Sequence, residues 1–174
     1  MTSGNTAFHG KLLAIGITTE AALPLAAVDS IAAMAGRGLT GDRYAEGKGV
    51  GQHGPAKPEQ EVTLIEQEAI TAAGQEYKLS FTHLETRRNL LTTGVPLNHL
   101  VGKTFTVGEV LLRGIELCEP CGHLEKLTCT GIKRSLVHRG GLRAQILRSG
   151  VLRVGDEVFP TEHEKQVSNL DLGK

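Results

Sequence analysis

The residues that decide the fold are FTVGEVLLRGIEL, at positions 105–117. Two apolar runs, 105–107 and 110–117, flank Gly108, and this pattern predicts two β-strands joined by a tight turn. Glycine supplies 22 of the 174 residues, well above the usual share of about 7%. An excess of glycine without low complexity indicates many tight turns and close backbone approaches. The chain is therefore expected to be rich in β-structure.

Working outward, we expect further strands and a few helices. Helices are predicted at 66–73, ended by Gly74, and at 131–138, whereas 28–35 is ambiguous between helix and strand. The remaining strands are predicted at 11–17, at 62–65, at 79–91, and in a closing hairpin of 142–147 and 151–159 around Ser149-Gly150. Seven or more short strands with two or three helices predict a mainly β fold, a closed or nearly closed β-barrel.

The domain organisation is simple. The length fits one domain, which we place at 10–160, with loosely ordered tails at 1–9 and 161–174. Residues 36–58 contain seven glycines and two prolines, so they are expected to form a long loop. A loop of that length in a compact domain is more often functional than idle.

Composition excludes several classes of protein. Nineteen basic residues balance nineteen acidic ones, and aromatics are 3% with no Trp, which argues against nucleic-acid binding. No signal peptide and no bilayer-spanning segment is evident, so no membrane association is expected. The three cysteines do not resemble a disulfide framework. We expect a cytoplasmic protein with reduced thiols.

Charge is unevenly distributed despite the neutral total. Residues 126–155 carry seven basic side chains and no acidic one, whereas 58–77 carry five glutamates and no basic residue. The basic segment comes shortly after Cys121, where it would favour the thiolate of that residue and attract an anionic ligand. The alternative is an ordinary solvated face, which we expect for most of the seven.

The segment Cys118-Glu119-Pro120-Cys121-Gly122-His123 is the strongest local motif. A Cys-x-x-Cys pair suggests redox exchange, metal ligation or an activated thiolate. A zinc site would need all four candidate ligands, Cys118, Cys121, His123 and Cys129. They lie in one short segment, whereas zinc modules normally take their ligands from two separated knuckles. Alternatively, Cys118 and Cys129 are small core residues. Cys121, between Pro120 and Gly122 at a strand end, lies in a turn where a thiolate can face a pocket.

Two further motifs suggest anion binding. On a continuous strand, Arg87 and Asn89 share a face and Arg88 points away, so the first two would form an anion clamp inside the barrel. The alternative is a pair of surface arginines at a strand end. Asp42-Arg43 lies in the glycine-rich loop, where it indicates either turn chemistry with solvated charge or a phosphate cradle.

Taken together, these residues resemble the MOSC family, named for the C-terminal domain of molybdenum-cofactor sulfurases. The similarity spans roughly 10–160 through seven short elements in order. These are Gly41-Asp42-Arg43-Tyr44, Glu61-Val62-Thr63-Leu64-Ile65, Arg87-Arg88-Asn89-Leu90, Gly102-Lys103-Thr104-Phe105, Pro120-Cys121, Arg139-Gly140-Gly141 and Gly150-Val151-Leu152-Arg153-Val154-Gly155-Asp156.

The resemblance implies a stand-alone β-barrel that binds the molybdenum cofactor, a molybdopterin bearing a phosphate. By matching position, Cys121 would be the molybdenum ligand and the catalytic residue, while Arg87, Asn89 and Arg43 would contact the cofactor. Pyridoxal phosphate is associated with the family through the sulfurases, but no lysine here stands out as a Schiff-base residue, so it is not expected.

Three functions remain open at this stage. The first is a small molybdoenzyme that reduces N-hydroxylated or N-oxidised compounds, with a small-molecule substrate and a redox partner protein. The second is a sulfur carrier that receives a persulfide on Cys121 from a sulfur-donor protein. The third is a zinc-stapled interaction domain without catalysis.

Overall fold

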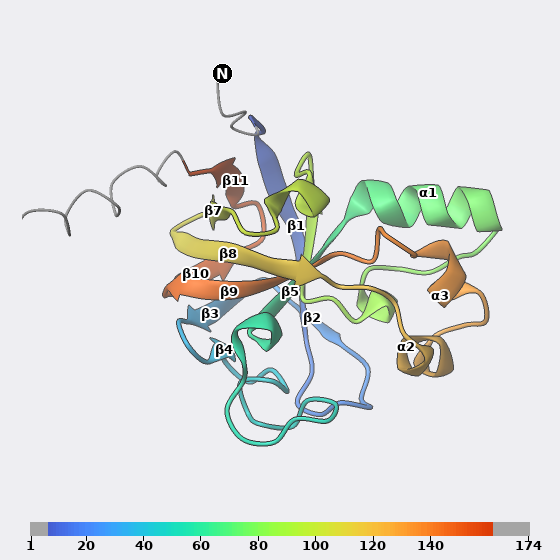
Figure 1. Ribbon diagram of the computed structural model, residues 1–174, viewed down its shortest axis with the longest axis horizontal. Coiled ribbons are helices and arrows are strands. Elements are labelled where there is room, and N and C mark those ends of the chain that lie inside the picture. Colours follow the sequence, from blue (N-terminus) through green and yellow to red (C-terminus); the bar gives the residue numbers. More distant parts are fainter. Residues whose placement is uncertain (1–6, 162–174) are drawn as a thin grey trace, which may run out of the picture.

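The structure is a computed structural model that describes residues 7–161, and within them seven strands close a β-barrel (Figure 1). The barrel order is β11-β7-β8-β9-β5-β6-β1, and β1 closes it by pairing with β11, with Gly10 opposite Val158. This confirms the prediction of a mainly β, closed barrel with a few short helices. The barrel strands are β1 (Gly10–Ile17), β5 (Val62–Glu66), β6 (Leu90–Thr93), β7 (Thr104–Val107), β8 (Val110–Leu117), β9 (Leu142–Arg148) and β11 (Glu157–Pro160).

The stretch 105–117 forms the hairpin β7–β8, with Phe105 opposite Leu112 and both completely buried in the barrel core. The turn needs Gly108, because its φ is +55° and an added Cβ would lie 2.5 Å from the Asp156 carboxylate. Alternate residues of β8 from Val110 to Gly114 are buried, as is usual for a strand with one face on the core. The core of leucine, isoleucine and valine therefore fills the barrel interior.

All but one of the pairings around the barrel are antiparallel. The exception is β5 with β6, where Leu64 lies opposite Leu90, and the parallel arrangement needs a crossover that α1 (Gln67–Tyr77) begins. The helix was predicted to end at Gly74, which is wrong, because it continues three residues further to Tyr77, and the capping residue Lys78 is left-handed. Gly74 instead supplies the carbonyl that accepts from the capping N–H groups of Lys78 and Leu79.

The three α-helices gather at one side of the barrel (Figure 1). With α1 lie α2 (Gly122–Leu127) and α3 (Ile132–Ser135), and a second apolar cluster joins them to the barrel through Ile65, Leu124 and Leu136. Short 3₁₀ helices lie at Pro58–Gln60 (η1), Leu84–Thr86 (η2) and Leu97–Leu100 (η3). None of the helices in the described part of the chain is long and apolar enough to cross a bilayer.

Strand pairing differs from the expectation at the C-terminal end. The predicted hairpin around Ser149-Gly150 is wrong, because β9 already has β8 on one edge and β5 on the other. The next strand, β10 (Gly150–Arg153), therefore joins a separate three-stranded sheet with β3 (Ser30–Met34) and β4 (Gly38–Leu39). The ambiguous segment 28–35 is thus mostly strand. A further strand, β2 (Ala26–Val28), pairs with β1.

The predicted strand at 79–91 is also wrong over most of its length. It contains η2 and a left-handed residue, Arg87, with φ +61°, and only its last two residues enter β6. Side-chain bonds within the segment compete with sheet pairing, since the Thr86 hydroxyl donates to the His83 carbonyl and the His83 ring bonds the Arg88 carbonyl.

The predicted loose tails fall largely outside the described residues. Positions 7–9 and 161 are described, and the His9 ring stacks on Phe159 with centroids 4.4 Å apart while its Nε2 lies 3.0 Å from Glu157. The long loop at 36–58 is mostly irregular, as predicted, apart from β4 and Pro58, which begins η1.

Candidate functional site

A cavity of about 280 Å³ opens between the glycine-rich loop, η1, the Arg87-Arg88 segment and the turn from β8 into α2. Its wall contains residues from chain segments that are far apart in sequence. The wall includes four arginines and two cysteines, which are Arg43, Arg87, Arg88, Arg143, Cys118 and Cys121. The cavity is therefore basic on balance, with four arginines against Glu59 and Glu119.

The two cysteines of the motif share this cavity but differ in exposure. Cys118 directly follows β8 and is buried, and its N–H donates to the Gly141 carbonyl at 2.7 Å. Cys121 has extended backbone before α2 and is exposed, in the turn that the sequence predicted. Cys129 does not line the cavity, and burial followed by the charges of Glu85 and Glu125 raises the pKa of its thiol. Cys121 is thus the accessible thiol of the cavity.

The zinc alternative receives no support. The four residues that it needs all lie within the described range, yet no group of three or more His, Cys, Asp or Glu side chains there is placed to hold a metal ion. The alternative made Cys118 and Cys129 small core residues. Cys118 is buried but lines the cavity, and Cys129 is half-buried against the second apolar cluster.

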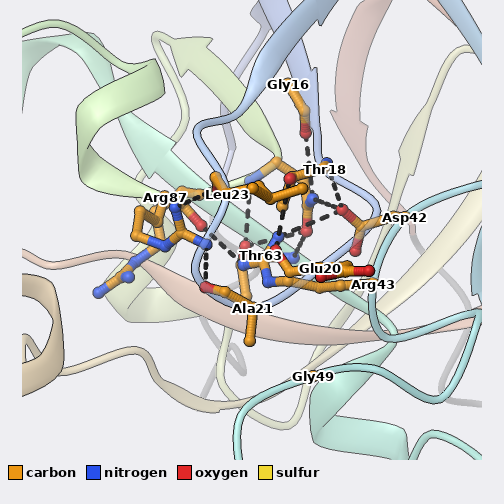
Figure 2. A network of polar contacts seen from close by, with 12 residues as sticks. Gly16, Thr18, Glu20, Ala21, Leu23, Asp42, Arg43, Gly49, Thr63 and Arg87 are labelled. Atoms are coloured by element: carbon orange, nitrogen blue, oxygen red, sulfur yellow. Dashed lines mark hydrogen bonds and ion pairs between the residues drawn. The ribbon is translucent and has the colours of Figure 1, made fainter. Parts of the chain in front are cut away.

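The glycine-rich loop brings a buried ion pair to the cavity (Figure 2). Asp42 accepts from Arg43 Nη1 at 3.2 Å. Both side chains are buried, so the alternative of a turn with solvated charges is wrong. The Arg43 guanidinium also lies over the Tyr44 ring, 4.9 Å from its centroid. The absence of a side chain at Gly49 leaves room for the Tyr44 ring, since an added Cβ would lie 2.2 Å from a ring carbon.

Arg87 lies in the wall, but much of its hydrogen-bonding capacity is used within the protein. Its guanidinium donates to the Leu23 carbonyl at 2.8 Å and to the Ala21 carbonyl, which fixes the 21–23 segment (Figure 2). Burial and the nearby charge of Arg43 lower the pKa of this guanidinium. It remains a cation, because arginine is not deprotonated in proteins.

Asn89 does not line the cavity, so the face predicted to be shared with Arg87 is not formed. The reason is the left-handed turn at Arg87, which breaks the extended geometry assumed for the segment. The Asn89 amide is buried, with Oδ1 3.1 Å from both the Thr63 N–H and hydroxyl donors, and Nδ2 3.1 Å from the Gly16 carbonyl and 3.3 Å from Asp42 Oδ1. Asn89 thus helps to position the Asp42 carboxylate of the ion pair without lining the cavity itself.

Two wall arginines were missed from sequence. Arg88 was expected to point away, but it is buried and donates to the Gly140 carbonyl at 2.7 Å, the Thr86 carbonyl at 3.1 Å and the Cys118 carbonyl at 2.9 Å. Arg143 lies on β9, and of the seven residues in the basic segment it is the one that lines the cavity. The excess of basic residues at 126–155 pointed to this part of the chain, but it did not distinguish Arg143 from the other six.

His123 completes the wall beside Cys121. Its Nε2 is buried, and no described residue provides a hydrogen-bond partner for it. A buried imidazole nitrogen without a partner is costly, so this atom is suited to a ligand's polar group.

The comparisons identify the class of protein. The family model of the MOSC domain matches residues 50–159, more than half of the chain, and the chain belongs to the MOSC domain family. No curated protein sequence matches the chain.

Among solved structures, YuaD from Bacillus subtilis superposes with a TM-score of 0.74 at 15% identity, covering 88% of this chain and 96% of that one. YiiM from Geobacillus stearothermophilus gives 0.66 at 14% identity, with 88% and 75% covered. YiiM from Escherichia coli gives 0.62 at 16% identity, with 91% and 71% covered. At these sequence identities, the structural similarity is evidence for the fold alone.

Proposed function

We propose that the cavity binds the molybdenum cofactor and that the Cys121 sulfur is the molybdenum ligand. The observation that carries this proposal is the exposed Cys121 thiol on the wall of a basic cavity. Thiolate is a soft ligand of the kind that such metals accept from proteins. The MOSC family, to which the chain belongs, is associated with this cofactor.

The residues present fit the chemistry of this group. Guanidinium groups suit its phosphate, and the unpartnered Nε2 of His123 suits a polar edge of the pterin. Arg43 and Arg87 offer their remaining N–H groups, and Arg88 adds positive charge while it holds the cysteine segment. When bound, the cofactor would supply two-electron chemistry, and we propose reduction of N-hydroxylated or N-oxidised small molecules as the reaction.

Metal and pterin analysis tests the proposal. The chain is produced in cells that make the cofactor, and molybdenum and pterin are measured per protein. Stoichiometric amounts are expected in the wild type, with molybdenum lost in Cys121→Ser and retained in the matched Cys129→Ser variant, whose thiol lies outside the cavity. A folded wild-type protein without molybdenum and pterin contradicts the proposal.

A sulfur-carrier role is the second candidate, favoured by the presence of Cys118 on the same wall. Here the Cys121 thiolate takes the terminal sulfur of a donor protein's persulfide, and the donor leaves as a thiolate. Mass spectrometry after incubation with a persulfidated donor would find one added sulfur atom on Cys121. An unmodified Cys121 peptide contradicts this role.

A further inference from the structure

The four arginines of the cavity are not equivalent, because the protein itself uses some of their N–H donors. Arg88 donates to three backbone carbonyls and Arg87 to two. Arg43 donates to the Asp42 carboxylate and the Arg87 carbonyl. These three guanidinium groups hold chain segments together, and for each of them ligand binding is a secondary use.

Arg143 differs from the other three. No backbone carbonyl in the described chain accepts a hydrogen bond from its guanidinium, whose partners are the Tyr44 side chain and Glu116, with Nε 3.5 Å from Oε1. Burial alone would lower the pKa of Arg143, but the nearby Cys118, Tyr44 and Glu116 raise it overall. Most of its five donors are therefore available.

The position of Arg143 is rigid. It lies in β9 opposite Thr63 of β5, which also lines the cavity, and opposite Glu116 of β8. A side chain fixed on a barrel strand between two neighbouring strands is better positioned for recognition than one on a loop. Its side chain is 29% exposed, so charge-assisted bonds there are stronger than at an open surface.

Glu116 is a weak competitor for the guanidinium. Its side chain is 58% exposed and the contact to Arg143 is long, so the pair contributes little to stability. An anion that reaches the cavity with two oxygens can replace the single carboxylate contact, because a guanidinium binds oxyanions in a bidentate manner.

We propose that Arg143 is the phosphate-recognition residue of the cavity, where its guanidinium binds the phosphate monoester of the ligand and displaces Glu116. The inference deepens the proposed function, on which it rests for the identity of the ligand. Two sources of phosphate are conceivable, the cofactor itself and a phosphorylated substrate.

The first test measures binding of inorganic phosphate to the full chain produced in cells that cannot make the cofactor. The thermal midpoint is followed against phosphate concentration, and the fitted dissociation constant is compared among variants. Arg143→Gln is expected to weaken binding by roughly ten- to a hundredfold, as loss of charged hydrogen bonds does. Glu116→Gln is expected to tighten binding by about two- to fivefold, since it removes an exposed competitor.

Arg113→Gln is the matched control, an exposed arginine on β8 outside the cavity, and it should bind phosphate as the wild type does. It also reports the general stabilisation of proteins by phosphate salts. Arg143→Lys should retain partial binding, because it keeps the charge without the planar fork. Equal binding by Arg143→Gln and Arg113→Gln overturns the proposal. If Arg143→Gln does not fold, unchanged binding by Glu116→Gln overturns it.

The second test identifies the source of the phosphate. In cofactor-producing cells, a lower pterin content in Arg143→Gln than in Arg113→Gln supports the cofactor's phosphate. Unchanged pterin with lost phosphate binding supports a phosphorylated substrate. The phosphate arm contains no cofactor, so the failure of this inference is distinguishable from the absence of molybdenum that would contradict the proposed function.

Discussion

The Nη2 atom of Arg88 donates to the carbonyl oxygen of Cys118 at 2.9 Å, which joins the segment before β6 to the cysteine turn. The same guanidinium also bonds Gly140 and Thr86. A single buried cation therefore links the 86–88 segment to the chain at Cys118 and at Gly140. Cys118 is thus held by a contact from a distant part of the chain.

Replacing Arg88 should destabilise the whole protein. Arg88→Met keeps the volume but leaves three carbonyls without their donor, at a cost of about 2–4 kcal/mol in the free energy of unfolding. Urea denaturation measures the loss, with the exposed Arg113→Met as control. A cost below that of the control would contradict the assigned contacts.

Gly141 tests the close approach of β9 to β5. Its φ is +112° and an added Cβ would lie 2.0 Å from the Leu64 carbonyl oxygen, so Gly141→Ala should cost at least about 3 kcal/mol or prevent folding. Gly155→Ala is the matched control, because its φ is +97° with open space around it, and should cost about 1 kcal/mol. Equal midpoints in urea for the two variants would be inconsistent with the packing described.

Asn89 should prove to be a positioning residue. Asn89→Ala removes bonds to Thr63, Gly16 and Asp42, and should lower the free energy of unfolding by about 2–3 kcal/mol. Asn89→Asp should be worse, because it places a second carboxylate beside Asp42 in the interior. Urea denaturation of the cofactor-free chain measures both. If Asn89→Ala lowered cofactor content without lowering stability, Asn89 would instead be a direct contact.

Glu66 should make stability depend on pH. Burial, and secondly the charge of Glu68, raises its pKa from 4.5 to about 7. Below pH 4.5 the carboxyl is protonated in both states, and as the pH rises towards 7 only the unfolded state ionises, so stability is lost over this window. Glu66→Gln should therefore gain up to about 2 kcal/mol over the wild type at pH 8 and almost nothing at pH 4.

The measurement is urea denaturation of both proteins at several pH values, with the exposed Glu46→Gln as control. The difference between variant and wild type cancels the other titrating groups. A difference that does not grow with pH would show that Glu66 ionises normally in the folded protein.

The three thiols should alkylate at different rates. Cys121 is exposed, Cys118 is buried, and the pKa of Cys129 is raised. Iodoacetamide at pH 8 followed by peptide mass spectrometry should label Cys121 at least about tenfold faster than either other thiol. Faster labelling of Cys129 would exclude Cys121 as the reactive thiol of the native protein.

The candidate site was partly predictable. The turn at Cys121 followed from Pro120 and Gly122 beside a strand end, and the loop with Arg43 from its glycines. The burial of Asp42 and Arg43 did not follow. Each looks like an ordinary turn residue, until the Thr18 N–H and the Asn89 amide donate to Asp42, and Arg43 donates to Asp42 and to the Arg87 carbonyl. Only one residue of the basic segment lines the cavity, and charge counting cannot select it.

The sequence by itself predicted a mainly β barrel, because short apolar runs and glycine turns are local signals, and seven short elements in order indicated the resemblance to the MOSC family. The tertiary structure decided which arginines remain available to a ligand. The guanidinium of Arg87 donates to the carbonyls of residues 21 and 23, and that of Arg88 donates to the carbonyls of residues 118 and 140. These acceptors come close only when the barrel closes, so no pattern along the chain distinguishes those arginines from Arg143.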